Sequence, residues 1–162
     1  MATISLPMDF QTNFQFLLRW IHLLSGIAWI GMLYWFNLVN VNFQKGLDAD
    51  TKKKINPDLL SRTLWWFRWG AMVTLIAGLL IVINKIANGG WEVLGTPWGI
   101  SISIGGILGI IMWFNVWFII WPNQKVIIAV NVKAQKEGKP VEALGNRPRV
   151  AFLASRTNTM LS

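Results

Sequence analysis

The chain contains a single histidine, His22, which stands inside the apolar run 19–31 (RWIHLLSGIAWIG). On an α-helix, Arg19, His22, Gly26 and Trp29 share one face. An imidazole nitrogen can bind haem iron, a glycine one turn away leaves room for the macrocycle, an arginine nearer the water can pair with a propionate, and an indole can pack against the ring. Because ionisable groups inside a membrane are costly, they are functional candidates. The pattern therefore suggests a b-type haem site in which His22 is the metal ligand.

A purely structural interpretation of the same face stays open. His22 can hydrogen-bond to a neighbouring helix, and Gly26 can be a packing notch. The second axial ligand of a haem is also open: Met72, Met112 and the His22 of another copy of the chain are candidates, although methionines in spans are usually packing residues.

Three apolar segments must position these residues. The chain has 162 residues, of which 54% are hydrophobic and 11 are tryptophans, a residue that concentrates at membrane interfaces. Segments 14–39, 65–83 and 98–121 are each long enough to cross a hydrocarbon core of about 30 Å. We therefore predict an all-α integral membrane protein, a helical bundle that forms a single domain over residues 1–162.

The distribution of lysine and arginine predicts the orientation. Segment 40–64 holds five of these residues and segment 122–162 holds seven, whereas the connection 84–97 holds only Lys85. By the positive-inside rule the two basic segments are cytoplasmic and the N-terminus is outside. The basic segments are expected to meet anionic lipid, and no nucleic-acid-binding module is evident.

Proline and glycine positions predict where the helices end. We expect a turn before Pro57, a tight Gly-rich loop over 84–97, and an exit from the third span at Pro122. Residues 123–150 are then expected to form a helix along the membrane surface followed by a loop. Residues 151–162 begin like a fourth helix that enters from the cytoplasmic side.

Two features within the third span predict helix packing. Gly105 and Gly109 form a G-x-x-x-G step, which permits close approach of a neighbouring helix. The alternative is a flexible glycine-rich stretch. Asn115 is a polar side chain in apolar surroundings, so we expect it to hydrogen-bond across helices.

Several chemistries are excluded or disfavoured by composition. The chain has no cysteine, which excludes disulfides, thiolate zinc sites, iron–sulfur clusters and covalently attached haem. No Asp or Glu lies within a predicted span, which argues against a carboxylate proton relay or a dimetal site. The chain also lacks a phosphate-binding loop and a nucleophile–histidine–acid set, so hydrolase and nucleotide chemistry are not expected.

Two segments resemble a known family. Residues 17–37 (LLRWIHLLSGIAWIGMLYWFN) resemble the first helix of the membrane domain of bacterial PuuD-type urate oxidases, the urate oxidase N-terminal domain family. Residues 111–125 (IMWFNVWFIIWPNQK) resemble a later helix of that domain, and 156–162 (RTNTMLS) resembles a segment that leads into a further span. The resemblance implies the family's membrane fold, a bacterial cytoplasmic membrane and electron transfer. By a more remote similarity to small histidine-containing membrane proteins, it also implies a b-type haem on His22.

Full-length members of that family also carry a c-type cytochrome domain. The present chain has no C-x-x-C-H motif, so the resemblance implies the fold rather than urate oxidation. The sequence therefore predicts a membrane redox protein that holds b-type haem through His22. The alternative is a non-catalytic accessory subunit of a larger respiratory, photosynthetic or oxidising complex. Either function implies other membrane subunits or a homo-oligomer as partners.

Overall fold

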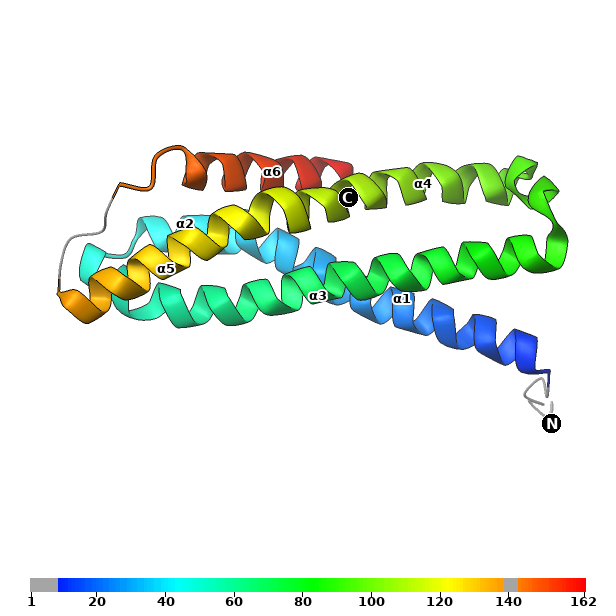
Figure 1. Cartoon of the computed structure of the whole chain (residues 1–162), viewed down its shortest axis with the longest axis horizontal. Coiled ribbons are helices and arrows are strands. Elements are labelled where there is room, and N and C mark those ends of the chain that lie inside the picture. The colour runs from blue at the N-terminus through cyan, green and yellow to red at the C-terminus, as the bar shows by residue number, and fades with distance from the viewer. Residues whose placement is uncertain (1–8, 139–142) are drawn as a thin grey trace.

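Three long helical rods and one shorter helix make up most of the part of the chain that the structure describes (Figure 1). The computed structural model describes residues 9–138 and 143–162, and this part of the chain contains no β-strand. The predicted all-α bundle is therefore confirmed. The first rod consists of α1 (Phe10–Tyr34), the π-helix η1 (Trp35–Asn40) and α2 (Val41–Lys45). The second rod is α3 (Ala49–Gly89), which is followed by the 3₁₀ turn η2 (Trp91–Gly95). The third rod consists of α4 (Pro97–Phe114), the π-helix η3 (Asn115–Ile120) and α5 (Trp121–Glu137), and the shorter helix is α6 (Arg147–Leu161).

Each rod is long and apolar enough to cross a membrane. The rods contain 36, 41 and 41 residues, so at 1.5 Å per residue they are about 54 to 62 Å long, well beyond a hydrocarbon core of about 30 Å. The three predicted spans lie inside these rods. Each rod is therefore several helical turns longer than a membrane crossing requires.

The predicted turn before Pro57 is wrong, because α3 runs through this residue. The helix begins earlier, where the carboxylate of Asp48 accepts hydrogen bonds from the backbone N–H groups of Asp50 and Thr51. This N-cap fixes the helix start. Pro57 removes only the hydrogen bond to the carbonyl of Lys53, and this end of α3 is polar, so water can solvate the freed carbonyl.

The predicted helix end at Pro122 is also wrong. The third rod continues from Pro97 to Glu137, so the first part of segment 123–150 extends this rod rather than forming a separate surface helix. The π-helix η3 immediately precedes the proline, and such local adjustments of hydrogen bonding accommodate proline inside membrane helices. Residues 139–142, which belong to the predicted basic segment 122–162, lie outside the described residues.

The connection 84–97, which was predicted to be a tight loop, is largely helical. Helix α3 continues to Gly89 and ends at Gly90, whose φ of +70° is a left-handed conformation that suits glycine. After the turn η2, the hydroxyl of Thr96 accepts a hydrogen bond from the N–H of Gly99 and caps α4.

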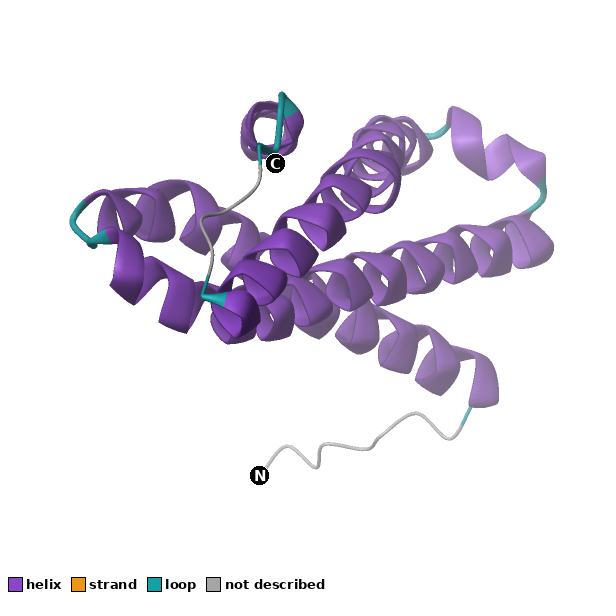
Figure 2. Cartoon of the chain, turned by 60° about the vertical axis from the view of Figure 1, so that its left-hand side comes forward, coloured by secondary structure: helices purple, strands orange, loops and turns teal. Residues whose placement is uncertain are grey.

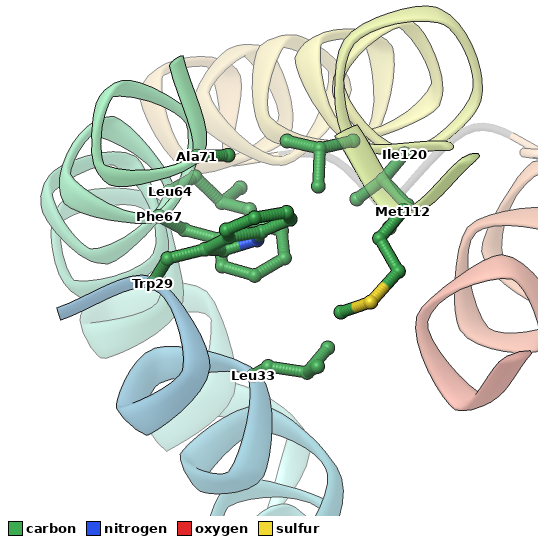
Figure 3. Packing of buried hydrophobic residues seen from close by; sticks show 8 residues of the cluster. Trp29, Leu33, Leu64, Phe67, Ala71, Met112 and Ile120 are labelled. Atoms are coloured by element: carbon green, nitrogen blue, oxygen red, sulfur yellow. The ribbon is translucent and has the colours of Figure 1, made fainter. Parts of the chain in front are cut away.

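A hydrophobic core joins the middle of all three rods. In Figure 3 the side chains of Trp29, Leu33, Phe67 and Met112 point toward one another. Phe36 adds an edge-to-face contact with Phe67, with ring centroids 5.7 Å apart. The buried members of the core are Trp29, Leu33, Leu64, Phe67, Ala71, Met112, Val116 and Ile120.

The fourth helix, α6, lies alongside the third rod, where it contacts η3 and α5 (Figures 1 and 2). Ala151 and Asn158 are buried in this contact. The helix expected over 151–162 is therefore present, and it packs against the bundle over its described length.

Candidate functional site

Helices α1 and α3 approach most closely along a row of small residues on α3. A β-carbon added at Gly70 would lie 3.2 Å from the backbone nitrogen of Trp29 and 3.4 Å from the carbonyl oxygen of Ser25. Thr74 and Gly78 continue the row at four-residue spacing and therefore face α1 as well. The small side chains allow the two backbones to come close together, as is common between membrane helices.

The imidazole of His22 lies against this row. Its Nδ1 atom is 2.9 Å from the carbonyl oxygen of Thr74, so Nδ1 carries the hydrogen and donates it. A β-carbon added at Gly78 would lie only 3.0 Å from Cε1 of the ring. The ring therefore occupies the space that the missing side chain of Gly78 leaves open.

The Nε2 atom of His22 is the chemically available nitrogen. The residue is exposed at the surface of the bundle, and within the described ranges Nε2 has no hydrogen-bond partner. A ring that donates from Nδ1 to a backbone carbonyl presents the lone pair of Nε2, which is the arrangement of many metal-ligating histidines.

The structure does not bring Gly26 and Trp29 into an open cofactor pocket. Gly26 faces Thr74, whose Cγ2 atom would lie 3.8 Å from an added β-carbon. Trp29 is 4% exposed and belongs to the hydrophobic core. The face predicted to receive haem is instead the face that packs on α3, so Gly26 and Trp29 are packing residues and only the edge of this face, at His22, is accessible.

The two methionines considered as a second ligand of His22 lie on α3 and α4. Met112 is buried in the core beside Leu33, which is eleven residues from His22, or about 16 Å along α1. Met72 is partly buried on α3. In residues 9–138 and 143–162, no three His, Cys, Asp or Glu side chains gather into a metal site.

Arg19 lies one turn from His22 toward the start of α1. It lines a hollow between this end of α1 and the end of α3, together with Lys85. Arg19 is therefore nearer the start of α1 than His22 is, and it is exposed.

A second polar site joins the π-helices to α6. Asn115, in η3, donates a hydrogen bond to the side-chain oxygen of Asn158 at 2.8 Å, and Asn158 donates to the carbonyl of Met112 at 2.9 Å. In the other π-helix, Asn37 donates to the hydroxyl of Ser155 at 2.7 Å. Asn115 therefore does hydrogen-bond across helices. Each π-helix supplies one asparagine to α6.

A repeat in the sequence marks Asn37 and Asn115, the two asparagines that the π-helices supply. The tripeptide Trp-Phe-Asn occurs at 35–37 and again at 113–115, and each copy follows a glycine four residues before its tryptophan, Gly31 and Gly109. Each asparagine lies in a π-helix. The repeat therefore marks equivalent positions in the first and third rods. π-helical turns are often found at functional sites.

The predicted packing pair Gly105 and Gly109 contacts no other helix of the described chain. No neighbouring atom would lie within 4 Å of a β-carbon added at either residue. Close helix packing inside the chain occurs instead at Gly70.

Arg68 is a further polar residue within the second rod. Its guanidinium carbon lies 3.8 Å from the centre of the Trp121 ring, a cation–π contact. Its Nε atom is buried and makes no hydrogen bond in the described structure. Arg68 therefore stacks on the third rod.

Comparison of the chain with protein-family models, with characterised proteins and with solved structures finds no match. The resemblance to the urate oxidase family therefore stays a prediction.

Proposed function

We propose that this protein is a membrane redox subunit that contributes His22 as one axial ligand of a b-type haem shared with a second polypeptide. The observation that supports it is the orientation of His22: Nδ1 is fixed on the carbonyl of Thr74, and Nε2 is accessible at the bundle surface. A histidine that only joined helices would need no accessible second nitrogen.

The residues around His22 fit the requirements of an iron ligand. The carbonyl of Thr74 orients the ring and raises the basicity of Nε2. Gly78 leaves the space in which the Nδ1–Cε1 edge of the ring lies against α3. The haem, when bound, supplies one-electron transfer, while this chain fixes the direction of the imidazole.

The need for a second polypeptide follows from the same geometry. Gly26 and Trp29 are committed to packing on α3, and Met112 is committed to the core. We place the other axial ligand on another membrane subunit or on His22 of a second copy. The urate oxidase family is the reaction context that the sequence resemblance suggests, with electron transfer rather than urate oxidation assigned to this chain.

The charge distribution supports a proposed topology. The junction between α2 and α3 carries Lys45, Lys52, Lys53 and Lys54, whereas the opposite end of the bundle carries Arg19 and Lys85. By the positive-inside rule we place the junction in the cytoplasm and the start of α1 outside, in a bacterial cytoplasmic membrane, with the basic segments against anionic lipid.

An absorption spectrum of protein purified in mild detergent, without steps that strip cofactors, tests the haem proposal. We expect a Soret band in the wild type and its loss in His22→Ala. Ser25→Ala is the matched control, because Ser25 lies at the same interface and its hydroxyl bonds within α1 and to Thr74. A wild type without a Soret band, isolated together with its partner subunits, would contradict the proposal.

The alternative is a non-catalytic accessory subunit. The observation that favours it is the outer face of α4, where Gly105 and Gly109 meet no neighbour and Ile104 and Ile107 are 58% and 59% exposed. Such a face suits a helix of another subunit. Replacing both glycines by leucine should then abolish co-purification of partner subunits while the Soret band, if present, is retained. Retained haem with lost partners supports the accessory role, and lost haem with His22 intact supports a haem at the subunit interface.

A further inference from the structure

The end of the bundle that carries the start of α1 contains a polar hollow of about 340 Å³. Volumes of this size can accommodate a small ligand. Its lining includes two cationic side chains and four amides, namely Arg19, Lys85, Gln11, Gln15, Asn84 and Asn88. These residues come only from α1 and α3, so the hollow is formed where the two helices begin to diverge (Figure 1).

The electrostatic character of the hollow is positive. No carboxylate lines it, and in the described part of the chain no ion pair joins Arg19 or Lys85 to an acidic residue. The ammonium group of Lys85 also lies 5.9 Å from the centre of the Trp98 ring, which lines a neighbouring hollow. Two cations held together without a counter-ion attract an anion.

The amides in the hollow also have an unmatched acceptor. Gln11 and Gln15 both donate from Nε2 to the side-chain oxygen of Asn84. The Oε1 atom of Gln15 is buried and has no hydrogen-bond partner among the described residues. Because this atom has no exposed surface, a ligand in the hollow does not reach it. The two cationic side chains are therefore the groups that define the ligand, and they call for an anionic group.

The position of the hollow suggests where such a ligand comes from. It lies near the end of a rod that can cross a membrane, close to the partly exposed Trp98 and the exposed Trp91. Tryptophans of this type lie at the level of lipid headgroups. The exposed apolar side chain of Phe16 also lines the hollow and continues toward the lipid-facing surface.

We propose that this hollow binds the headgroup of an anionic phospholipid such as phosphatidylglycerol. Arg19 and Lys85 hold the phosphodiester. The acyl chains follow the apolar surface of α1 past Phe16. This site involves neither His22 nor a haem, so it stands independently of the redox proposal.

Native mass spectrometry of the full chain, released from nanodiscs of mixed phosphatidylglycerol and phosphatidylcholine, tests this site. We expect the wild type to retain phosphatidylglycerol in preference to phosphatidylcholine. The double variant Arg19→Gln/Lys85→Gln should lower the retained fraction about tenfold or more, because two charge-assisted contacts are lost. Arg19→Lys keeps the charge and should retain most of the binding.

A matched control separates this site from general attraction to a basic protein. Lys136→Gln/Arg149→Gln removes the same two charges from exposed positions elsewhere on the molecule and should change retention less than twofold. Equal losses in the two double variants would mean that net charge alone attracts the lipid and would overturn the site.

Two further outcomes would also overturn it. Inorganic phosphate that competes as well as short-chain phosphatidylglycerol would show that the hollow takes a free anion rather than a lipid. Loss of a Soret band in Arg19→Gln/Lys85→Gln with unchanged lipid retention would assign the two cations to haem propionates. Circular dichroism of each variant checks that the helices are intact.

Discussion

The side chains of Asn115 and Asn158 are joined by a hydrogen bond of 2.8 Å, and Asn158 is fully buried. Asn158 also donates to the carbonyl of Met112. This pair is the polar connection between the third rod and α6. Its partners lie 43 residues apart in the chain, so it fixes how α6 is positioned along the bundle.

Replacing Asn158 by alanine should loosen α6. The change leaves the amide of Asn115 without its partner in an apolar contact, and we expect a loss of about 1–2 kcal/mol in the free energy of unfolding. Unfolding by SDS in mixed micelles measures it. Thr157→Ala is the control, because Thr157 is exposed and bonds only within its own helix. Equal effects of the two substitutions would argue against the asparagine pair.

Replacing Gly70 by alanine should separate α1 from α3. The new methyl group would lie 3.2 Å from the nitrogen of Trp29, and this backbone cannot move without disturbing the core. We expect a cost of about 1–3 kcal/mol, typical of overpacking. Gly31→Ala is the matched control: Gly31 has no neighbour within 4 Å of an added β-carbon, so the change should be neutral or stabilise the helix by up to about 1 kcal/mol. The same SDS titration compares the two.

Replacing Gly78 by alanine should displace the ring of His22. The added methyl group would lie 3.0 Å from Cε1, so the hydrogen bond from Nδ1 to the carbonyl of Thr74 should weaken. In ¹⁵N NMR of histidine-labelled protein, we expect a protonated Nδ1 and an unprotonated Nε2 in the wild type and a mixture of tautomers in the variant. In Gly26→Ala, the added methyl group makes an ordinary contact of 3.8 Å with Thr74, so the spectrum should resemble the wild type. A wild-type ring protonated on Nε2 alone would refute the assigned orientation.

The start of α3 should depend on pH through Asp48. Hydrogen bonds from the side chain and then the backbone of Thr51 lower the pKa of this carboxyl below its ordinary value of 3.8. Because the folded-state pKa is depressed, the stabilisation is complete above the ordinary value and is lost as the pH falls through the folded-state pKa. The protection of the amides of residues 49–52 against hydrogen exchange, relative to their intrinsic exchange rates at the same pH, should therefore fall below about pH 4.

The substitution Asp48→Asn removes the negative charge of this side chain but keeps its ability to cap the helix. Asparagine is also a good N-cap residue, so the first turn should form in the variant while the acid-dependent exchange disappears. Acceleration of exchange at the same pH in both proteins would show that another group controls this end of the helix.

The sequence was sufficient to predict the architecture because its apolar segments are long. A run such as 98–121 contains no charge, and only a membrane-spanning or deeply buried helix suits it. The helix ends are harder to predict, because the residue before a proline disfavours the helical conformation and so indicates a boundary. Pro57 and Pro122 are both inside rods, the former where water can reach the freed carbonyl and the latter after a π-helical turn.

The candidate site could be predicted only in part. His22 was identifiable as an unusual residue within an apolar helix, but the partner of its Nδ1 atom is a backbone carbonyl 52 residues away, and a backbone group leaves no mark in the sequence. The same holds for the choice of packing glycines. Gly70 and Gly105 are both glycines in apolar helices, and only the three-dimensional arrangement shows which one faces another rod.

The two π-helical turns are Trp35–Asn40 and Asn115–Ile120. Each contains one residue more than an α-helix would have over the same length of its axis. Deleting one residue from either turn would convert it to regular α-helix. The side chains in the two flanking parts of the rod would then still point in the same directions relative to one another. Relatives one residue shorter at these points can therefore retain the same core contacts and lose only the local asparagine contact with α6. Gaps in future alignments should be placed at these two turns.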